Sequence, residues 1–107
     1  KATESLVLWD VMSKRVDNPD FAEIAGLQAA EICLEQQLYD QALSYCTRIV
    51  SASESINIDR AMAMQARIYR AMGNKQESLK TYEELLRLFP RSIYVREART
   101  ALRQKSN

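Results

Sequence analysis

The chain has 107 residues, of which 47% are hydrophobic and 27% charged, with a formal net charge of +1. This length allows at most one domain, in which roughly two thirds of the surface of the unfolded chain becomes buried. The sequence contains no His, and no stretch reaches the roughly 18 apolar residues that a membrane-spanning helix needs. The commonest general base and a transmembrane segment are therefore excluded.

Charge is distributed unevenly along the chain. Residues 1–58 carry four Lys or Arg and nine Asp or Glu, whereas residues 59–107 carry eleven and five. The basic half suits an acidic partner, and the opposite signs also suit head-to-tail contact between copies. Ordinary solvated helix faces account for the same distribution, so these interpretations stay open.

Only two Gly and two Pro occur, and helix-forming residues dominate, so we predict an all-α chain. The first helix is predicted over about residues 2–14 and ends before Asn18 and Pro19, which disfavour continuation. The second is predicted from Asp20 to about Gln36, with Asp20 as N-cap because a Glu follows three residues later. Each carries an apolar stripe that can pack on a neighbour.

The third helix is predicted from Tyr39 to about Ala52, and the Ser-rich connector "SASESIN" follows it. The fourth is predicted from about Asp59 to Met72, with Gly73 as a left-handed cap. The short turn at Gly73 joins the fourth helix to the fifth, so these two helices are expected to form a second hairpin.

The fifth helix begins after Asn74, which can cap it, and ends at Pro90. A shorter sixth helix follows, with Ser92 as its predicted cap. The chain therefore offers six helices and no evident strand.

The segments "ATESLVLW", "YDQALSYC" and "KQESLKTY" share one pattern at spacings of 37 and 36 residues. A small residue is followed by Leu, and a larger residue stands four positions after the small one. The small residues are Ser5, Ala42 and Ser78. A period of this length in helical hairpins predicts a solenoid in which each hairpin buries its apolar face by stacking on the next.

Residues 59–92 resemble the tetratricopeptide repeat, through a set of six positions: Ala66, Tyr69, Gly73, Ser78, Tyr82 and Pro90. Residues 23–56 match less completely, because Gln37 replaces the turn Gly and Glu54 stands at the position of the Pro. The resemblance implies an all-α fold of antiparallel helical hairpins stacked as a right-handed superhelical solenoid.

On this basis we expect a single tetratricopeptide-like domain over residues 1–107. Residues 1–19 would supply the second helix of a partial repeat, residues 20–56 and 57–91 two full repeats, and residues 92–107 a capping helix. Because the chain starts with Lys inside a predicted helix, we expect it to be a fragment of a longer protein.

The exit sequence "LLRLFPRSIYVREARTAL" also resembles tetratricopeptide proteins of the bacterial cell envelope, the Tol-Pal-associated and outer-membrane assembly lipoprotein groups. This resemblance implies a periplasmic or outer-membrane-associated protein.

The sequence offers little for catalysis or for a cofactor. No Gly-rich loop could hold a phosphate, and the adjacent Glu83 and Glu84 point to different sides of their helix. Cys33 and Cys46 lack the further ligands that zinc requires, and their levels in the hairpin differ too much for a disulfide. We therefore predict a non-enzymatic protein without cofactor or metal, with both Cys as core residues.

Partner binding remains, and the resemblance implies that the first helix of each repeat lines a concave groove. There Arg60, Arg67 and Arg70 form one stripe, which can hold carboxylates of an acidic peptide or protein through charge-assisted hydrogen bonds. A second basic surface is the last helix, with Arg96, Arg99 and Arg103.

The preceding repeat presents Gln28, Glu31 and Glu35 on the equivalent face, where they could pair with the Arg stripe instead. Groove binding and internal pairing both stay open, and a ligand could displace the pairs. Nucleic acid is a weaker alternative because no aromatic residues interleave with the Arg residues. Self-association through the open ends of the solenoid is the alternative function, and no membrane insertion is expected.

Overall fold

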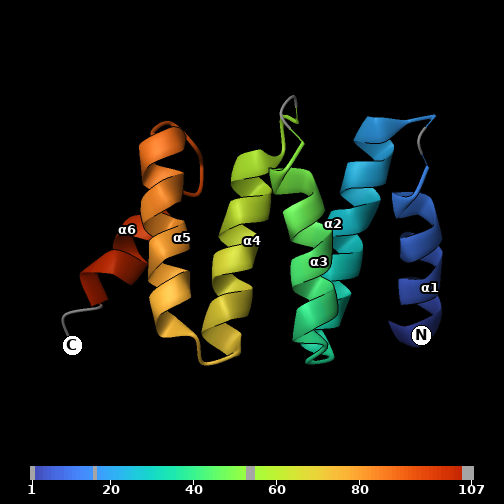
Figure 1. Ribbon diagram of the computed structural model, residues 1–107, viewed down its shortest axis with the longest axis horizontal. Coiled ribbons are helices and arrows are strands. Elements are labelled where there is room, and N and C mark those ends of the chain that lie inside the picture. The colour runs from blue at the N-terminus through green and yellow to red at the C-terminus, as the bar shows by residue number, and fades with distance from the viewer. Residues whose placement is uncertain (1, 16, 53–54, 105–107) are drawn as a thin grey trace.

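The computed structural model describes residues 2–15, 17–52 and 55–104, and within these residues the chain forms six α-helices and no strand. Helices α1 to α5 stand side by side and run alternately up and down, and α6 crosses behind α5 (Figure 1). The molecule measures 42 × 29 × 18 Å. The helices are α1 (Ala2–Ser13), α2 (Pro19–Glu35), α3 (Tyr39–Val50), α4 (Ile58–Ala71), α5 (Lys75–Leu88) and α6 (Val95–Gln104).

Each helix packs against the next one in the chain, and α2 also contacts α4. The helices α2 and α3 form one hairpin, and α4 and α5 form the next. The predicted all-α solenoid of tetratricopeptide-like hairpins is therefore confirmed. None of the helices in the described part of the chain is both long and apolar enough to cross a membrane.

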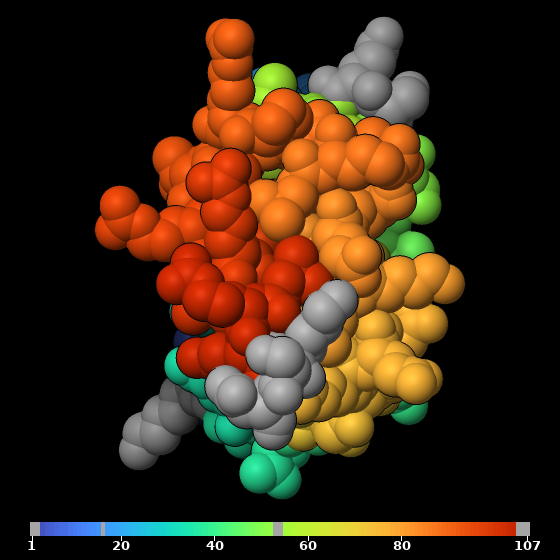
Figure 2. Space-filling model, turned by 90° about the vertical axis from the view of Figure 1, so that its left-hand side faces the viewer, coloured from blue at the N-terminus to red at the C-terminus, as the bar shows by residue number. Residues whose placement is uncertain are grey.

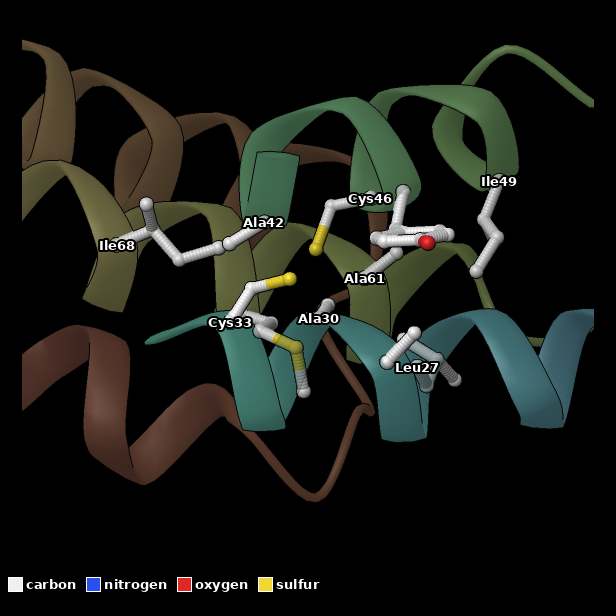
Figure 3. Close-up of a cluster of buried hydrophobic side chains, with 11 residues drawn as sticks. Leu27, Ala30, Cys33, Ala42, Cys46, Ile49, Ala61 and Ile68 are labelled. Atoms are coloured by element: carbon white, nitrogen blue, oxygen red, sulfur yellow. The ribbon is translucent and has the colours of Figure 1, made fainter. Parts of the chain in front are cut away.

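The first core lies between α2, α3 and α4 (Figure 3). Small residues such as Ala30, Ala42 and Ala61 are fully buried there, so the helices approach each other closely. The free thiols of Cys33 and Cys46 are also fully buried in this core and project toward one another (Figure 3). Burial is the main cause that raises the pKa of the Cys46 thiol to about 12, so both residues act as core side chains.

A second core joins α4, α5 and α6. Tyr82 and Leu85 of α5 and Ala98 of α6 are almost completely buried in it. Val50 of α3 packs against both cores, which makes them continuous along the stack. The solenoid therefore has one uninterrupted apolar interior, built in two parts.

The ends of α2 correct one local prediction. Asn18, not Asp20, is the N-cap, because its side-chain oxygen accepts a hydrogen bond from the backbone N–H of Phe21, and Pro19 occupies the first helical position. Proline has no N–H to satisfy and its fixed φ suits this position, which leaves Asp20 in the first turn. Asp20 still favours the helix there because its charge complements the helix dipole.

The turns inside the two hairpins use different residues for the same backbone shape. Gly73 has φ of 86° and Gln37 has φ of 62°, both in the left-handed region. Asn74 caps α5 as predicted, by accepting a hydrogen bond from the backbone N–H of Glu77. The hairpin α2–α3 thus forms with Gln at a position that favours Gly.

The two connectors between hairpins make the same polar contact. The Ser55 hydroxyl donates to Glu23 at 2.6 Å, and the Ser92 hydroxyl donates to Asp59 at 2.6 Å. Each Ser oxygen also accepts a hydrogen bond from the backbone N–H two residues later, at 3.0 Å for Ser55 and 3.1 Å for Ser92. These contacts tie the start of α2 to the connector before α4, and the start of α4 to the connector before α6. They hold α2, α4 and α6 in one row.

Candidate partner-binding cleft

A cleft of about 590 Å³ lies where α4, α5 and α6 meet. We call it the α4–α6 cleft; its lining includes Arg67, Arg70, Tyr82, Ile93, Arg96 and Glu97. A smaller hollow of about 310 Å³ adjoins it through Arg70 and extends toward Lys75 and Leu79 of α5. Figure 2 views the molecule from this end, with α6 in red lying against α5 in orange. The cleft thus lies at the basic end of the stack.

Arg67 and Glu97 form the central contact of the α4–α6 cleft. Arg67 Nε donates to Glu97 Oε2 at 2.7 Å, and Arg67 Nη2 donates to Glu97 Oε1. The Tyr82 hydroxyl donates to Glu97 Oε2 at 2.6 Å, and the Arg67 guanidinium lies over the ring of Tyr94, 5.7 Å from its centroid. The pair therefore joins α4 to α6, with support from α5 and from the connector.

The environment keeps Glu97 ionised at neutral pH. Burial opposes its charge, but the hydrogen bonds from Arg67 and Tyr82 outweigh that cost and hold the pKa of the Glu97 carboxyl below its usual range. Burial, followed by the hydrogen bond to Glu97, raises the pKa of the Tyr82 hydroxyl, so Tyr82 stays a donor. Both carboxylate oxygens of Glu97 thus accept hydrogen bonds from side chains of its own chain.

Two other cationic side chains of the cleft do not form a contact of the kind that joins Arg67 to Glu97. Arg70 and Arg96 are both exposed. Neither has a side-chain hydrogen bond or an ion pair within residues 2–15, 17–52 and 55–104. Within the described residues they leave the α4–α6 cleft with an excess of positive charge that no acidic side chain neutralises.

The structure brings together only part of the predicted stripe. Arg67 and Arg70 line the same cleft, whereas Arg60 is half-buried at the start of α4 and does not line it. Glu31 and Glu35 are exposed on α2 and Gln28 is half-buried there. None of these three α2 residues lines a cavity with the Arg residues, so their part in binding stays a prediction, as does that of Arg60.

The predicted pairing of the stripe with the preceding repeat is not what the structure shows for Arg67. Its acidic partner is Glu97 of the following helix, and no ion pair joins Glu31 or Glu35 to the stripe in the described residues. Arg60 and Glu97 occupy corresponding positions 37 residues apart, as do Glu31 and Arg67 at 36. The two repeats thus carry opposite charges at equivalent sites.

Sequence reasoning named Arg96 only as part of a separate basic surface with Arg99 and Arg103. In the structure Arg96 lines the α4–α6 cleft, whereas Arg99 and Arg103 do not. Glu97 and Ile93 were missed. Applying the repeat spacing to α6 would have pointed to Glu97, because it then falls on the position of Arg60, for which the resemblance implies a place in the groove.

No group of three or more His, Cys, Asp or Glu residues that could hold a metal ion occurs in the described parts of the chain. The site offers hydrogen-bond donors, positive charge and an apolar edge rather than a set of metal ligands.

The fold and this cleft define a helical-repeat solenoid with a basic surface at one end. Residues 59–92 match the family model of the tetratricopeptide repeat, which supports a tetratricopeptide repeat family for the chain. The match spans α4, α5 and the connector as far as Ser92. Such repeats are in general non-catalytic modules of protein–protein interaction. Comparisons with curated proteins and with solved structures give no match.

Proposed function

We propose that this protein is a non-catalytic interaction scaffold that binds a partner peptide or protein in the groove along α2, α4 and α6. The observation that carries the proposal is the α4–α6 cleft, where Arg67 and Arg70 of one repeat meet α6. The proposed partner-binding residues are the basic stripe and the polar residues of α2: Arg60, Arg67, Arg70, Gln28, Glu31 and Glu35.

The architecture favours this function on physical grounds. Stacked hairpins make a rigid, extended surface, so a partner meets side chains that are already ordered and loses less free energy on binding. Arginine suits such a surface because its planar guanidinium can form two parallel hydrogen bonds with one carboxylate. An acidic partner is therefore the natural match for the stripe.

The test is capture of partners by the wild-type protein and by a groove variant with Arg60→Gln, Arg67→Gln and Arg70→Gln. The control variant carries Arg87→Gln, Arg91→Gln and Arg99→Gln, which removes the same charge from outside the cleft. We expect a partner that the wild type and the control capture and the groove variant loses, when circular dichroism shows all three to be folded. Equal capture by all three folded proteins would refute groove binding.

A second function, self-association, is favoured by a separate observation on α1. Val7, Leu8 and Val11 are 60%, 53% and 60% exposed and make an apolar face on this helix. If that face joins copies, the mass from light scattering should rise with concentration, and Val7→Glu with Val11→Glu should return it to that of the monomer. A constant monomer mass would exclude this function.

The exit sequence after α5 supports a finer proposal on location. Its resemblance to tetratricopeptide proteins of the bacterial cell envelope suggests a periplasmic or outer-membrane-associated scaffold. Fractionation of cells, with an antibody against these 107 residues, tests this, and recovery of the native protein in the cytosolic fraction alone would contradict it.

A further inference from the structure

We infer that the α4–α6 cleft is the specific docking site for an acidic protein segment that alternates carboxylates with apolar side chains, and that Arg70 and Arg96 bind the carboxylates. This rests on the proposed scaffold function and deepens it, because it names the end of the groove that binds and the chemistry of the partner. It also assigns different roles to neighbouring arginines.

The position of α6 is fixed by contacts that do not use Arg70 or Arg96. Ser92 bonds to Asp59 at the start of α4, and Glu97 is held by Arg67 and Tyr82. Arg67 is therefore a positioning residue, which shapes the cleft by holding α6. The cleft is preformed, so a partner meets Arg70 and Arg96 without first having to order the helices.

The charges of the cleft favour an anionic partner. Among the described residues of its lining Glu97 alone is acidic, and Arg67 neutralises it. Arg70 and Arg96 add two unneutralised charges, and Lys75 adds a third in the adjoining hollow. Carboxylates of a partner would form charge-assisted hydrogen bonds with guanidinium groups that have no such bond within the described residues.

An apolar contact accompanies these charges. Ile93 lines the cleft and is 84% exposed, which makes it one of the most exposed large hydrophobic side chains in the described residues. Ala101 lies in the same lining and offers a small, close surface. Ile93 lies just before α6 and Arg96 in its first turn, whereas Arg70 also lines the adjoining hollow with Ala101 near the end of α6. An apolar side chain of the partner could bury Ile93 next to a carboxylate held by Arg96, and a further carboxylate could reach Arg70, which accounts for the alternation that we propose.

The aromatic residues favour an acidic protein segment over single-stranded nucleic acid. Tyr82 is only 2% exposed, and the ring of Tyr94 is covered by Arg67. Tyr82 is thus closed to base stacking and Arg67 occupies one face of the half-buried Tyr94, which leaves little of the stacking that supplies much of the affinity for single-stranded nucleic acid. The guanidinium groups are therefore better matched to carboxylates than to a stacked oligonucleotide at this site.

The experiment measures fluorescence anisotropy with a labelled peptide of alternating glutamate and leucine. The comparison probes are a glutamate–serine peptide, a lysine–leucine peptide and a labelled single-stranded oligothymidine. We expect the glutamate–leucine peptide to bind most tightly, with an affinity that falls as salt is added. Arg70→Gln with Arg96→Gln should weaken its binding about tenfold.

Arg99→Gln with Arg87→Gln is the matched control, because it removes the same charge from α6 and α5 outside the cleft, and it should leave the affinity within about twofold. Ile93→Ser should weaken binding of the glutamate–leucine peptide but not of the glutamate–serine peptide. Circular dichroism and the urea midpoint establish that each variant is folded.

Several results would overturn the inference. They are an unchanged affinity in the Arg70 and Arg96 variant, an equal loss in the control variant, tighter binding of the oligothymidine, and no binding of the glutamate–leucine peptide. The scaffold function can survive any of them. In that case the Arg60, Arg67 and Arg70 variant still loses a captured partner, and the partner does not use the α4–α6 cleft in the proposed way.

Discussion

The two central hairpins, α2–α3 and α4–α5, reach the same shape from different sequences. The hairpin α4–α5 turns at Gly73 and ends at Pro90, whereas α2–α3 turns at Gln37, which adopts the same left-handed conformation. Both share the Ser–carboxylate contact at the connector that follows them. The comparison shows that helix packing and connector contacts determine the repeat structure. A glycine at the turn only lowers the free-energy cost of the left-handed conformation.

The groove-facing charges differ more than the backbone does. Arg67 and Glu97 form an ion pair, while Glu31 and Arg60 occupy the corresponding positions with reversed signs and form no ion pair within the described residues. Tyr82 and Tyr94 hold the Arg67–Glu97 contact in place, which the other pair lacks. The solenoid is thus regular in its core and asymmetric in the charges of its α2, α4 and α6 surface.

The largest effect on the free energy of unfolding is expected when equivalent core side chains of the two hairpins are truncated. Ile49 and Leu85 correspond at a spacing of 36 residues and are 4% and 0% exposed. Because each fills a helix interface, Ile49→Ala and Leu85→Ala should each lower the free energy of unfolding by about 2–5 kcal/mol. Urea denaturation followed by circular dichroism measures both losses.

Leu8→Ala is the control for these core variants, since Leu8 is 53% exposed, and it should change stability by less than about 0.5 kcal/mol. The continuous core predicts one cooperative transition in every variant. Two separate transitions, or a small loss for Ile49→Ala alone, would show that the hairpin α2–α3 is not an equal part of the stack.

These elements also show what could be predicted from sequence. The helices and their order follow from apolar spacing and from strong stop signals such as Asn18-Pro19, Gly73 and Pro90, because those residues act locally. The fold class follows from the repeated small residues, such as Ala42 and Ser78, because a stack with close helix contacts requires them.

The cleft could be predicted only in part. Arg67 and Arg70 share a face through helical spacing alone, so the sequence places them together. The pairing of Arg67 depends instead on where α6 docks, and this follows from long-range contacts such as the burial of Ala98 in the second core and the hydrogen bond between Ser92 and Asp59. Local periodicity contains no information on those contacts, which is why Glu31 and Glu35 were considered as partners and Glu97 was not.

A second prediction concerns pH and the acid at the centre of the cleft. Because the pKa of folded Glu97 lies below its usual range, its ionised form stabilises the fold above the pKa of the unfolded chain. That contribution is lost as pH falls through the folded pKa. Glu97→Gln should cost about 1–2 kcal/mol at neutral pH and should reduce the further loss of stability on acidification.

The measurement is the free energy of unfolding from neutral pH to the acid range. Glu84→Gln is the control, because Glu84 pairs only with Arg87 on the surface of its own helix, and its pH profile should follow the wild type. The pKa of Asp10 is also lowered, chiefly by a hydrogen bond from Tyr45. Asp10 therefore contributes a loss of stability at acid pH that remains in both variants. Identical slopes for Glu97→Gln and wild type would contradict the assigned role.

A third prediction sharpens the comparison of the two turns. Gln37→Gly removes the cost of a side chain in the left-handed region and should stabilise the protein by about 1 kcal/mol, less the added entropy of the unfolded chain. Gly73→Ala should destabilise it by about the same amount. Apart from Gly73 and its two chain neighbours, no heavy atom of the described residues would lie within 4 Å of a Cβ at this position, so the backbone conformation is what opposes that change. Thermal unfolding of both variants would reveal opposite shifts, and a loss in both would mean that Gln37 contributes a contact of its own.

The smallest expected effect is the difference in coupling free energy between the Arg67–Glu97 pair and the equivalent Glu31 and Arg60 positions. Double-mutant cycles measure this difference. The cycle of Arg67→Gln with Glu97→Gln should give a coupling of about 0.5–1 kcal/mol, near the upper end for a partly exposed pair, because both nitrogen contacts of Arg67 reach the same carboxylate. The cycle of Glu31→Gln with Arg60→Gln should give a coupling near zero. Added salt should weaken the first coupling only slightly, since Tyr82 and Tyr94 shield the pair.

Equal couplings in the two cycles would mean that Glu31 and Arg60 attract each other across solvent as strongly as the bonded pair does. The charge reversal between the repeats would then be a stabilising alternation along the stack. A coupling confined to Arg67 and Glu97 instead leaves Glu31 and Arg60 without an internal role in stability. Their charges would then be free to act on the partner that we propose, so the smallest free energy in this series bears on how far along α2 and α4 the proposed binding surface extends.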